Sequence, residues 1–146
     1  MITCQIEKPD YEELLSYMRY QIDEAFPHLR GEQRMMAFTD KLYAHADFCF
    51  SRDEEQIVGM IAYYANGEGA DFAYLAQVYV SPSYRRMGLC TRMLDLVTQD
   101  ARNKGFHEIR LEAYKNDVGP QLCYRHNGFR ATDIAMPDTL FMNRMI

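Results

Sequence analysis

The stretch SPSYRRMGLCTRML, residues 81–94, lies between an apolar run and an amphipathic helix and carries two adjacent arginines and a single glycine. A helix begins with backbone N–H groups that have no intrahelical partner, and its dipole makes that end mildly positive. Arginines and a flexible glycine at this point would strengthen a site for an anion. The alternative interpretation is a solvated turn that carries charge, and this stretch alone does not decide between the two.

The composition predicts a single folded domain over residues 1–146 in the cytoplasm. Apolar residues make up 48% of the chain and charged residues 25%, which is typical of a soluble globular protein. A net charge of −5 argues against a nucleic-acid surface, and acidic residues among positions 7–13 argue against a signal peptide. No stretch is long enough to span a membrane. The scattered cysteines and histidines predict reduced thiols and no metal site.

Hydrophobic periodicity predicts alternating strands and helices. A helix starting at Pro9 and Asp10 should end at AFPHLRGE (25–32), and Asn66-Gly67 with Gly69 signals a hairpin turn. The other helices are expected over residues 32–45, 88–104 and 119–126, and the strands over residues 3–7, 47–53, 56–65, 72–80, 107–114, 129–134 and 139–146. This order indicates an α/β (α+β) fold with a mixed sheet of six to seven strands, helices on both faces and a parallel crossover around residues 88–104.

Two motifs on these elements resemble the GNAT superfamily of acyl-CoA-dependent N-acetyltransferases. The family's pyrophosphate loop reads Arg or Gln, two variable residues, Gly, one variable residue, then Gly or Ala. Arg85, Gly88 and Cys90 occupy those places, so the last one departs from the pattern. The later signature, Leu-Tyr followed by three residues and Gly-Phe, is matched by Tyr124 with Gly128-Phe129, although Cys123 interrupts the Leu-Tyr pair.

The resemblance implies a mostly antiparallel sheet with one splayed parallel strand pair, which binds acetyl-CoA (coenzyme A) as co-substrate and needs no metal. The pantetheine arm would contact main chain of the strand before the loop, and the diphosphate would lie on the loop and the helix start. Asp117 has a second interpretation, as a cap of the helix that follows. The residues assigned to the cofactor are Val78, Tyr79, Val80, Arg85, Arg86, Met87, Gly88, Leu89, Cys90, Thr91, Asn116 and Asp117.

The resemblance also assigns the chemistry of acetyl transfer to an amine. Tyr124 would be the general acid beside the cofactor sulfur, and the backbone amide of Val78 the oxyanion donor. Glu112 would be the base, unless it is one half of a cross-strand pair with an arginine. Glu68, Asp71 or a chain of water molecules are the alternatives.

The acceptor is expected to be a primary amine of a small molecule, such as an amino sugar or a polyamine. Gln77, Tyr64 and Phe26 are the predicted substrate contacts, because the family builds its acceptor cleft from these parts of the chain. A peptide N-terminal acetyltransferase and a non-catalytic acyl-CoA-binding module are the alternative functions. No nucleic-acid or membrane partner is expected, and self-association into a homodimer is left open.

Overall fold

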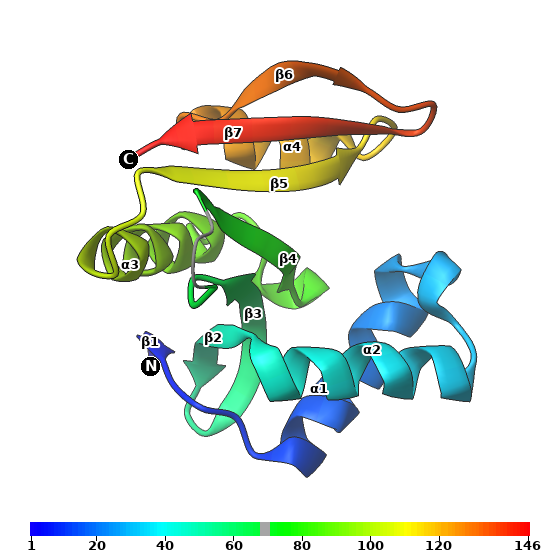
Figure 1. Ribbon diagram of the computed structural model, residues 1–146. Coiled ribbons are helices and arrows are strands. Elements are labelled where there is room, and N and C mark those ends of the chain that lie inside the picture. The colour runs from blue at the N-terminus through cyan, green and yellow to red at the C-terminus, as the bar shows by residue number, and fades with distance from the viewer. Residues whose placement is uncertain (68–70) are drawn as a thin grey trace.

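All seven strands of the fold belong to one sheet. The structure is a computed structural model that describes residues 1–67 and 71–146, so Glu68 and Gly69 of the predicted hairpin lie outside the described residues. The strand order is β1-β2-β3-β4-β5-β7-β6 (Figure 1). The strands are β1 (Ile2–Ile6), β2 (Asp47–Asp53), β3 (Gln56–Tyr64), β4 (Ala73–Val80), β5 (Glu108–Tyr114), β6 (Arg130–Ala135) and β7 (Thr139–Met145). Among the described residues, β4 and β5 are the one pair that runs parallel, which confirms the predicted mixed, mostly antiparallel sheet.

The helices begin and end close to the predicted residues. They are α1 (Tyr11–Ala25), α2 (Glu32–His45), α3 (Leu89–Asn103) and α4 (Val118–His126), with the short 3-10 turns η1 (Pro27–Leu29) and η2 (Pro82–Tyr84). The side chain of Asp10 caps α1 by accepting a hydrogen bond from the Glu13 amide at 3.0 Å. Within the part of the chain that the structure describes, no helix has both the length and the apolar character that crossing a membrane requires.

Two apolar cores lie on opposite faces of the sheet. On one face α1 and α2 contribute residues such as Leu14, Met18 and Leu42, which pack on strand residues that include Phe50 and Met60. On the other face, α3 and α4 cover a second core (Figure 1). That core includes Met93, Leu94, Val97, Tyr124 and Phe129 from the helical side and Ile61, Leu75, Ile109 and Leu111 from the sheet. The sheet is therefore buried on both faces, as predicted.

The parallel strand pair separates soon after it forms. Three residues of β4, Ala73 to Leu75, pair with β5, and residues 76–80 have no partner there. The register between β3 and β4 shifts at this point, because Ala62 lies opposite Gln77 and Tyr63 opposite Leu75, which leaves Ala76 as an extra residue in β4. A β-bulge bends its strand, and Figure 1 shows β4 diverging from β5. The divergence leaves one edge of β4 unpaired in the middle of the sheet.

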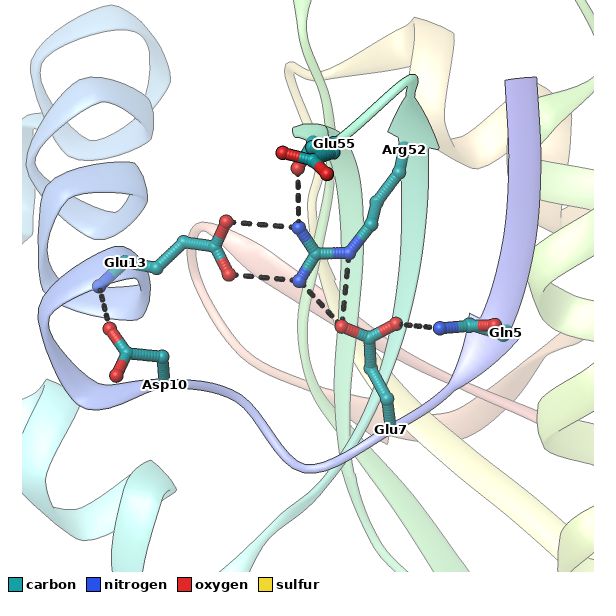
Figure 2. Close-up of polar contacts among 6 residues, drawn as sticks. All are labelled: Gln5, Glu7, Asp10, Glu13, Arg52 and Glu55. Atoms are coloured by element: carbon teal, nitrogen blue, oxygen red, sulfur yellow. Dashed lines mark hydrogen bonds and ion pairs between the residues drawn. The ribbon is translucent and has the colours of Figure 1, made fainter. Parts of the chain in front are cut away.

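A cluster of hydrogen bonds between charged side chains joins the segment after β1 and the start of α1 to β2 (Figure 2). The Arg52 guanidinium of β2 donates from Nε to the Glu7 carboxylate at 3.0 Å and from Nη1 and Nη2 to Glu13 at 2.9 and 2.8 Å. Its Nη1 also donates to the carbonyl of Glu55 at 2.6 Å. Because Arg52 and Glu7 are largely shielded from solvent, this cluster holds α1 in a defined position against β1 and β2.

Candidate active site

A cavity of about 270 Å³ opens where β4 and β5 diverge. Its walls come from segments far apart in the sequence: η1, α2, β4, β5, α4 and the start of β7. The lining residues are Phe26, His28, Leu29, Phe38, Tyr74, Leu75, Ala76, Gln77, Val78, Leu111, Glu112, Ala113, Tyr114, Asp117, Pro120, Tyr124 and Thr139. The splay of the sheet therefore creates a concave site that brings together both predicted catalytic residues.

Tyr124 lies on α4 and lines this cavity, although only 7% of its surface is exposed. Its ring packs edge-on against Phe129, with the ring centroids 6.0 Å apart. Burial, and after it the nearby thiols of Cys90 and Cys123, raises the pKa of its phenol above the ordinary value. Tyr124 is therefore fully protonated near neutral pH, as a proton donor must be before it reacts.

Glu112 lies on the exposed face of β5 and lines the same cavity. The Thr139 hydroxyl donates a hydrogen bond to its Oε2 at 2.6 Å, which orients the carboxylate. The residue opposite it on β7 is Phe141, and the nearby Arg110 pairs with Glu108 instead. The alternative interpretation of Glu112 as half of a cross-strand arginine pair is therefore wrong. Asp71 does not line the cavity, and Glu68 lies outside the described residues.

Two of the three predicted acceptor contacts line the cavity. Phe26 follows the end of α1, and Gln77 lies on β4 next to the bulge. The Gln77 side chain is buried and donates to the Gln21 Oε1 atom of α1 at 2.8 Å, so its amide is already oriented by a neighbour. Tyr64, at the end of β3, is absent from the lining and packs against the core under α1 and α2.

The structure adds His28 and Tyr114 to this end of the cavity. The Tyr114 hydroxyl lies 2.9 Å from His28 Nε2, linking the end of β5 to η1. Burial, with a smaller effect of Arg34, lowers the pKa of His28, so its imidazole is neutral near pH 7. The strand alternation that places Tyr114 on the face of Glu112 could have indicated Tyr114. No local pattern marks His28, which reaches the site only through the turn after α1.

The loop before α3 presents a run of free backbone donors. No turn or cap hydrogen bond within the described residues uses the amides of residues 86–91, and the first amide bonded within α3 is that of Arg92, to Gly88. Arg86 and Gly88 have left-handed backbone angles, φ of 64° and 76°. A Cβ atom at Gly88 would meet nothing within 4 Å. Open space beside successive amides at a helix start fits a diphosphate group.

Arg85, predicted to bind the cofactor, makes contacts within the protein. Its Nη2 forms an ion pair with Glu24 of α1, its Nε donates to the Val80 carbonyl at 2.9 Å, and its guanidinium lies 5.5 Å from the Tyr79 ring centre. The Tyr79 hydroxyl donates to the same Glu24 carboxylate at 2.9 Å. No local pattern marks Glu24 as the partner, because the pairing depends on how α1 lies against β4. The Arg85 guanidinium is thus held by α1 and β4, and its contact with the cofactor stays a prediction.

The other predicted cofactor residues take different positions around the loop. Met87 is exposed, and Leu89 is buried in the core, which leaves only its main chain for a ligand. Asp117 occupies the N-cap position of α4 and lines the cavity. Its side chain makes no capping hydrogen bond, so the alternative prediction that the Asp117 side chain caps this helix is wrong. Asn116 is exposed and does not line the cavity.

Titratable side chains in the described residues form no cluster of three or more His, Cys, Asp or Glu that could hold a metal ion.

Comparison with known proteins agrees with this fold. A model of the acetyltransferase (GNAT) family matches residues 7–129. The chain is 29% identical over 76 residues to GCN5-related N-acetyltransferase 6, chloroplastic, of Arabidopsis thaliana, and the aligned part spans 51% of this chain and 26% of that protein. The chain thus matches about a quarter of the length of this relative.

Solved structures share the whole fold at low sequence identity. An acetyltransferase of the GNAT family from Staphylococcus aureus Mu50 superimposes with a TM-score of 0.79 at 18% identity, covering 98% of this chain and 99% of that one. PaiA N-acetyltransferase from Thermoplasma acidophilum, in complex with coenzyme A, gives 0.74 at 19% identity over 99% of both chains. A GNAT family acetyltransferase from Elizabethkingia anophelis with acetyl-CoA bound gives 0.72 at 16% identity, covering 99% and 98%.

The seven-stranded sheet with its splayed parallel pair is the fold that these solved GNAT structures share. This chain belongs to the GNAT family of acetyltransferases.

Proposed function

We propose that the protein transfers an acetyl group from acetyl-CoA to the primary amine of a small molecule, with Tyr124 as general acid. The observation that carries this proposal is the placement of Tyr124 and Glu112 on one cavity beside the unpaired edge of β4. The family match to residues 7–129 supports the class of reaction.

Acetyl-CoA would be held along the free edge of β4 and on the loop. The amides of residues 86–91 would bind the diphosphate, with Gly88 giving the backbone room to approach it. Main chain at Val78 and Val80, beyond the last β5 partner, would hold the pantetheine arm. The bound cofactor supplies a thioester, which is the activated acyl donor.

Two side chains would then transfer protons, one as base and one as acid. Glu112, oriented by Thr139, would take the proton that the attacking amine loses, directly or through water. Tyr124 would give its proton to the departing thiolate, and the Val78 amide would donate to the developing oxyanion. Burial raises the Tyr124 pKa and so makes the phenol a weaker acid. The transfer therefore depends on a thiolate that is itself shielded from water, because shielding makes the thiolate a stronger base.

The acceptor would be small because the cavity is small. A volume of about 270 Å³ is at the low end of the range for small-molecule sites. Phe26, Phe38 and Tyr74 supply flat apolar walls, while Glu112 and neutral His28 are its polar groups for an amine. An amino sugar or a short polyamine combines these features, with apolar faces and at least one basic nitrogen.

The test is Tyr124→Phe, which removes only the hydroxyl. We expect kcat with an amine substrate to fall more than about tenfold while the calorimetric Kd for acetyl-CoA stays within about twofold. Tyr63→Phe is the matched control, because Tyr63 is equally buried but donates to Asp100 of α3 and does not line the cavity. Equal turnover in the Tyr124 variant would remove this residue from the mechanism. If the wild-type protein binds acetyl-CoA but acetylates no amine, it is a non-catalytic acyl-CoA-binding module.

A further inference from the structure

Two of the four cysteines meet beside the proposed cofactor site. Cys90 lies in the first turn of α3, next to the diphosphate loop, and Cys123 lies on α4 immediately before Tyr124. Each thiol is close enough to shift the pKa of the other, and both side chains pack against the core between these helices and the sheet. Both residues are partly buried, whereas Cys49 is buried.

Asn127 holds the two helices together at this point. Its Nδ2 donates to the Thr91 hydroxyl of α3 at 3.1 Å, to the Cys123 carbonyl at 2.8 Å and to the Cys123 sulfur at 3.6 Å. Because Thr91 directly follows Cys90, one side chain fixes the end of α4 on the first turn of α3. This bridge holds the helix segments that carry Cys90 and Cys123 next to each other.

The two sulfurs have different surroundings. The Asn127 amide donates a hydrogen bond to the Cys123 sulfur at 3.6 Å, and the neighbouring Cys90 thiol, together with this hydrogen bond, lowers the pKa of Cys123. The neighbouring Cys123 and burial raise the pKa of Cys90, so Cys90 keeps its proton. The other cysteines differ, since burial raises the pKa of Cys49 to about 12 and the Cys4 sulfur lies 3.1 Å from the Ser51 hydroxyl.

We propose that Cys90 and Cys123 form a redox site that a hydroperoxide converts to a disulfide. The Cys123 thiolate attacks one peroxide oxygen and the O–O bond breaks, which yields a sulfenic acid and, after proton uptake, water or an alcohol. The Cys90 sulfur then attacks the sulfenic sulfur, so that the S–O bond breaks and the S–S bond forms. The leaving hydroxide takes the Cys90 proton and departs as water. Two thiols are oxidised and one peroxide is reduced.

The effect on catalysis rests on the proposed function. A disulfide brings the two sulfur atoms to about 2 Å, closer than any hydrogen-bonded pair of thiols. The closure must move the first turn of α3, the segment around Tyr124, or both. Because a misplacement of about 1 Å at a reacting group can cost about a hundredfold in rate, we expect oxidation to reduce turnover at least tenfold. Dithiothreitol should restore it.

The experiment treats reduced full-length protein with hydrogen peroxide and reads the product by intact mass and non-reducing peptide mapping. We expect a loss of two hydrogens and a peptide pair that joins Cys90 to Cys123. Cys123→Ser should abolish both this cross-link and the peroxide sensitivity of turnover, with Cys123→Ala as a second variant in case serine disturbs the core. Cys4→Ser is the matched control and should cross-link like the unmodified chain.

The outcomes separate this proposal from the proposed function. Four free thiols after peroxide treatment, or a cross-link through Cys4 or Cys49, would overturn the redox site. A Cys90–Cys123 cross-link in a protein that binds no acetyl-CoA would support the redox site while refuting the proposed function. A cross-link that leaves turnover unchanged would overturn the claim that oxidation controls the site.

Discussion

Replacing Gly88 by alanine tests the diphosphate site with a single methyl group. Gly88 has φ of 76°, and a Cβ there would touch nothing within 4 Å, so any destabilisation comes from backbone strain and not from a clash. A left-handed alanine costs about 1–2 kcal/mol, and a stiffer unfolded chain offsets about 0.4–1 kcal/mol of this. The net loss of unfolding free energy is about 1 kcal/mol, which lowers Tm by roughly 2–4 °C in a domain of this size.

The effect on binding should be larger than the effect on stability. The methyl group enters the open space beside the amides of residues 86–91, where the diphosphate is proposed to lie. Losing one or two hydrogen bonds to a charged group costs about 1.5–3 kcal/mol each. A loss of about 2 kcal/mol weakens the Kd for acetyl-CoA by about thirtyfold.

Gly105→Ala is the matched control for Gly88→Ala. Gly105, just after the end of α3, has φ of 91° and equally open surroundings, but it is at the opposite end of that helix. Thermal unfolding should show similar losses for both variants, and isothermal titration with acetyl-CoA should show weaker binding only for Gly88→Ala. If the two variants bind acetyl-CoA equally well, the loop is not the diphosphate site and the reasoning from its free amides fails.

Two further predictions concern the ion cluster and the base. Glu7→Gln should lower the free energy of unfolding by about 1–2 kcal/mol at pH 7, because the Arg52 guanidinium loses a shielded charged partner. Burial raises the Glu7 pKa, but the hydrogen bonds from Arg52 and Gln5 outweigh it and lower the pKa overall. The charged carboxylate therefore stabilises the fold above the unfolded-state pKa, and this contribution disappears as pH falls through the lower folded-state value. Urea unfolding should show a difference between wild type and variant that shrinks from pH 6 to pH 3; a constant difference would contradict the assignment. Glu112→Gln should reduce turnover at least about tenfold while the Kd for acetyl-CoA stays unchanged. Glu108→Gln, on the same face of β5, is the control and should keep the wild-type turnover. Equal rates in the two variants would exclude Glu112 as the base.

The elements of this fold could be predicted from the sequence because their signals are local. The helix predicted over residues 32–45 has those same bounds, and the helix predicted over 88–104 forms as Leu89–Asn103. In both, an apolar stripe and a recognisable end specify the helix without reference to the rest of the chain. The pairing of β4 with β5 was also predictable, because a strand, a helix and a strand in that order favour a parallel crossover.

The partners of the site residues could not be predicted in the same way. Arg85 pairs with Glu24, Glu112 accepts from Thr139, and His28 meets Tyr114, in each case across a long separation in the chain. Which side chains meet depends on helix crossing, strand register and the bulge at Ala76, and these are properties of the packed molecule.

The sequence by itself determined the class of fold and the position of the loop before α3, because short-range periodicity and turn chemistry carry that information along the chain. The resemblance of its motifs to the GNAT family supplied Tyr124 and Glu112 as candidates. Only the tertiary structure decided that Arg85 is bound to the protein, that Tyr64 lies outside the cavity and that Cys90 meets Cys123. Those outcomes follow from close packing between distant segments, where a shift of one residue in register would exchange one set of neighbours for another.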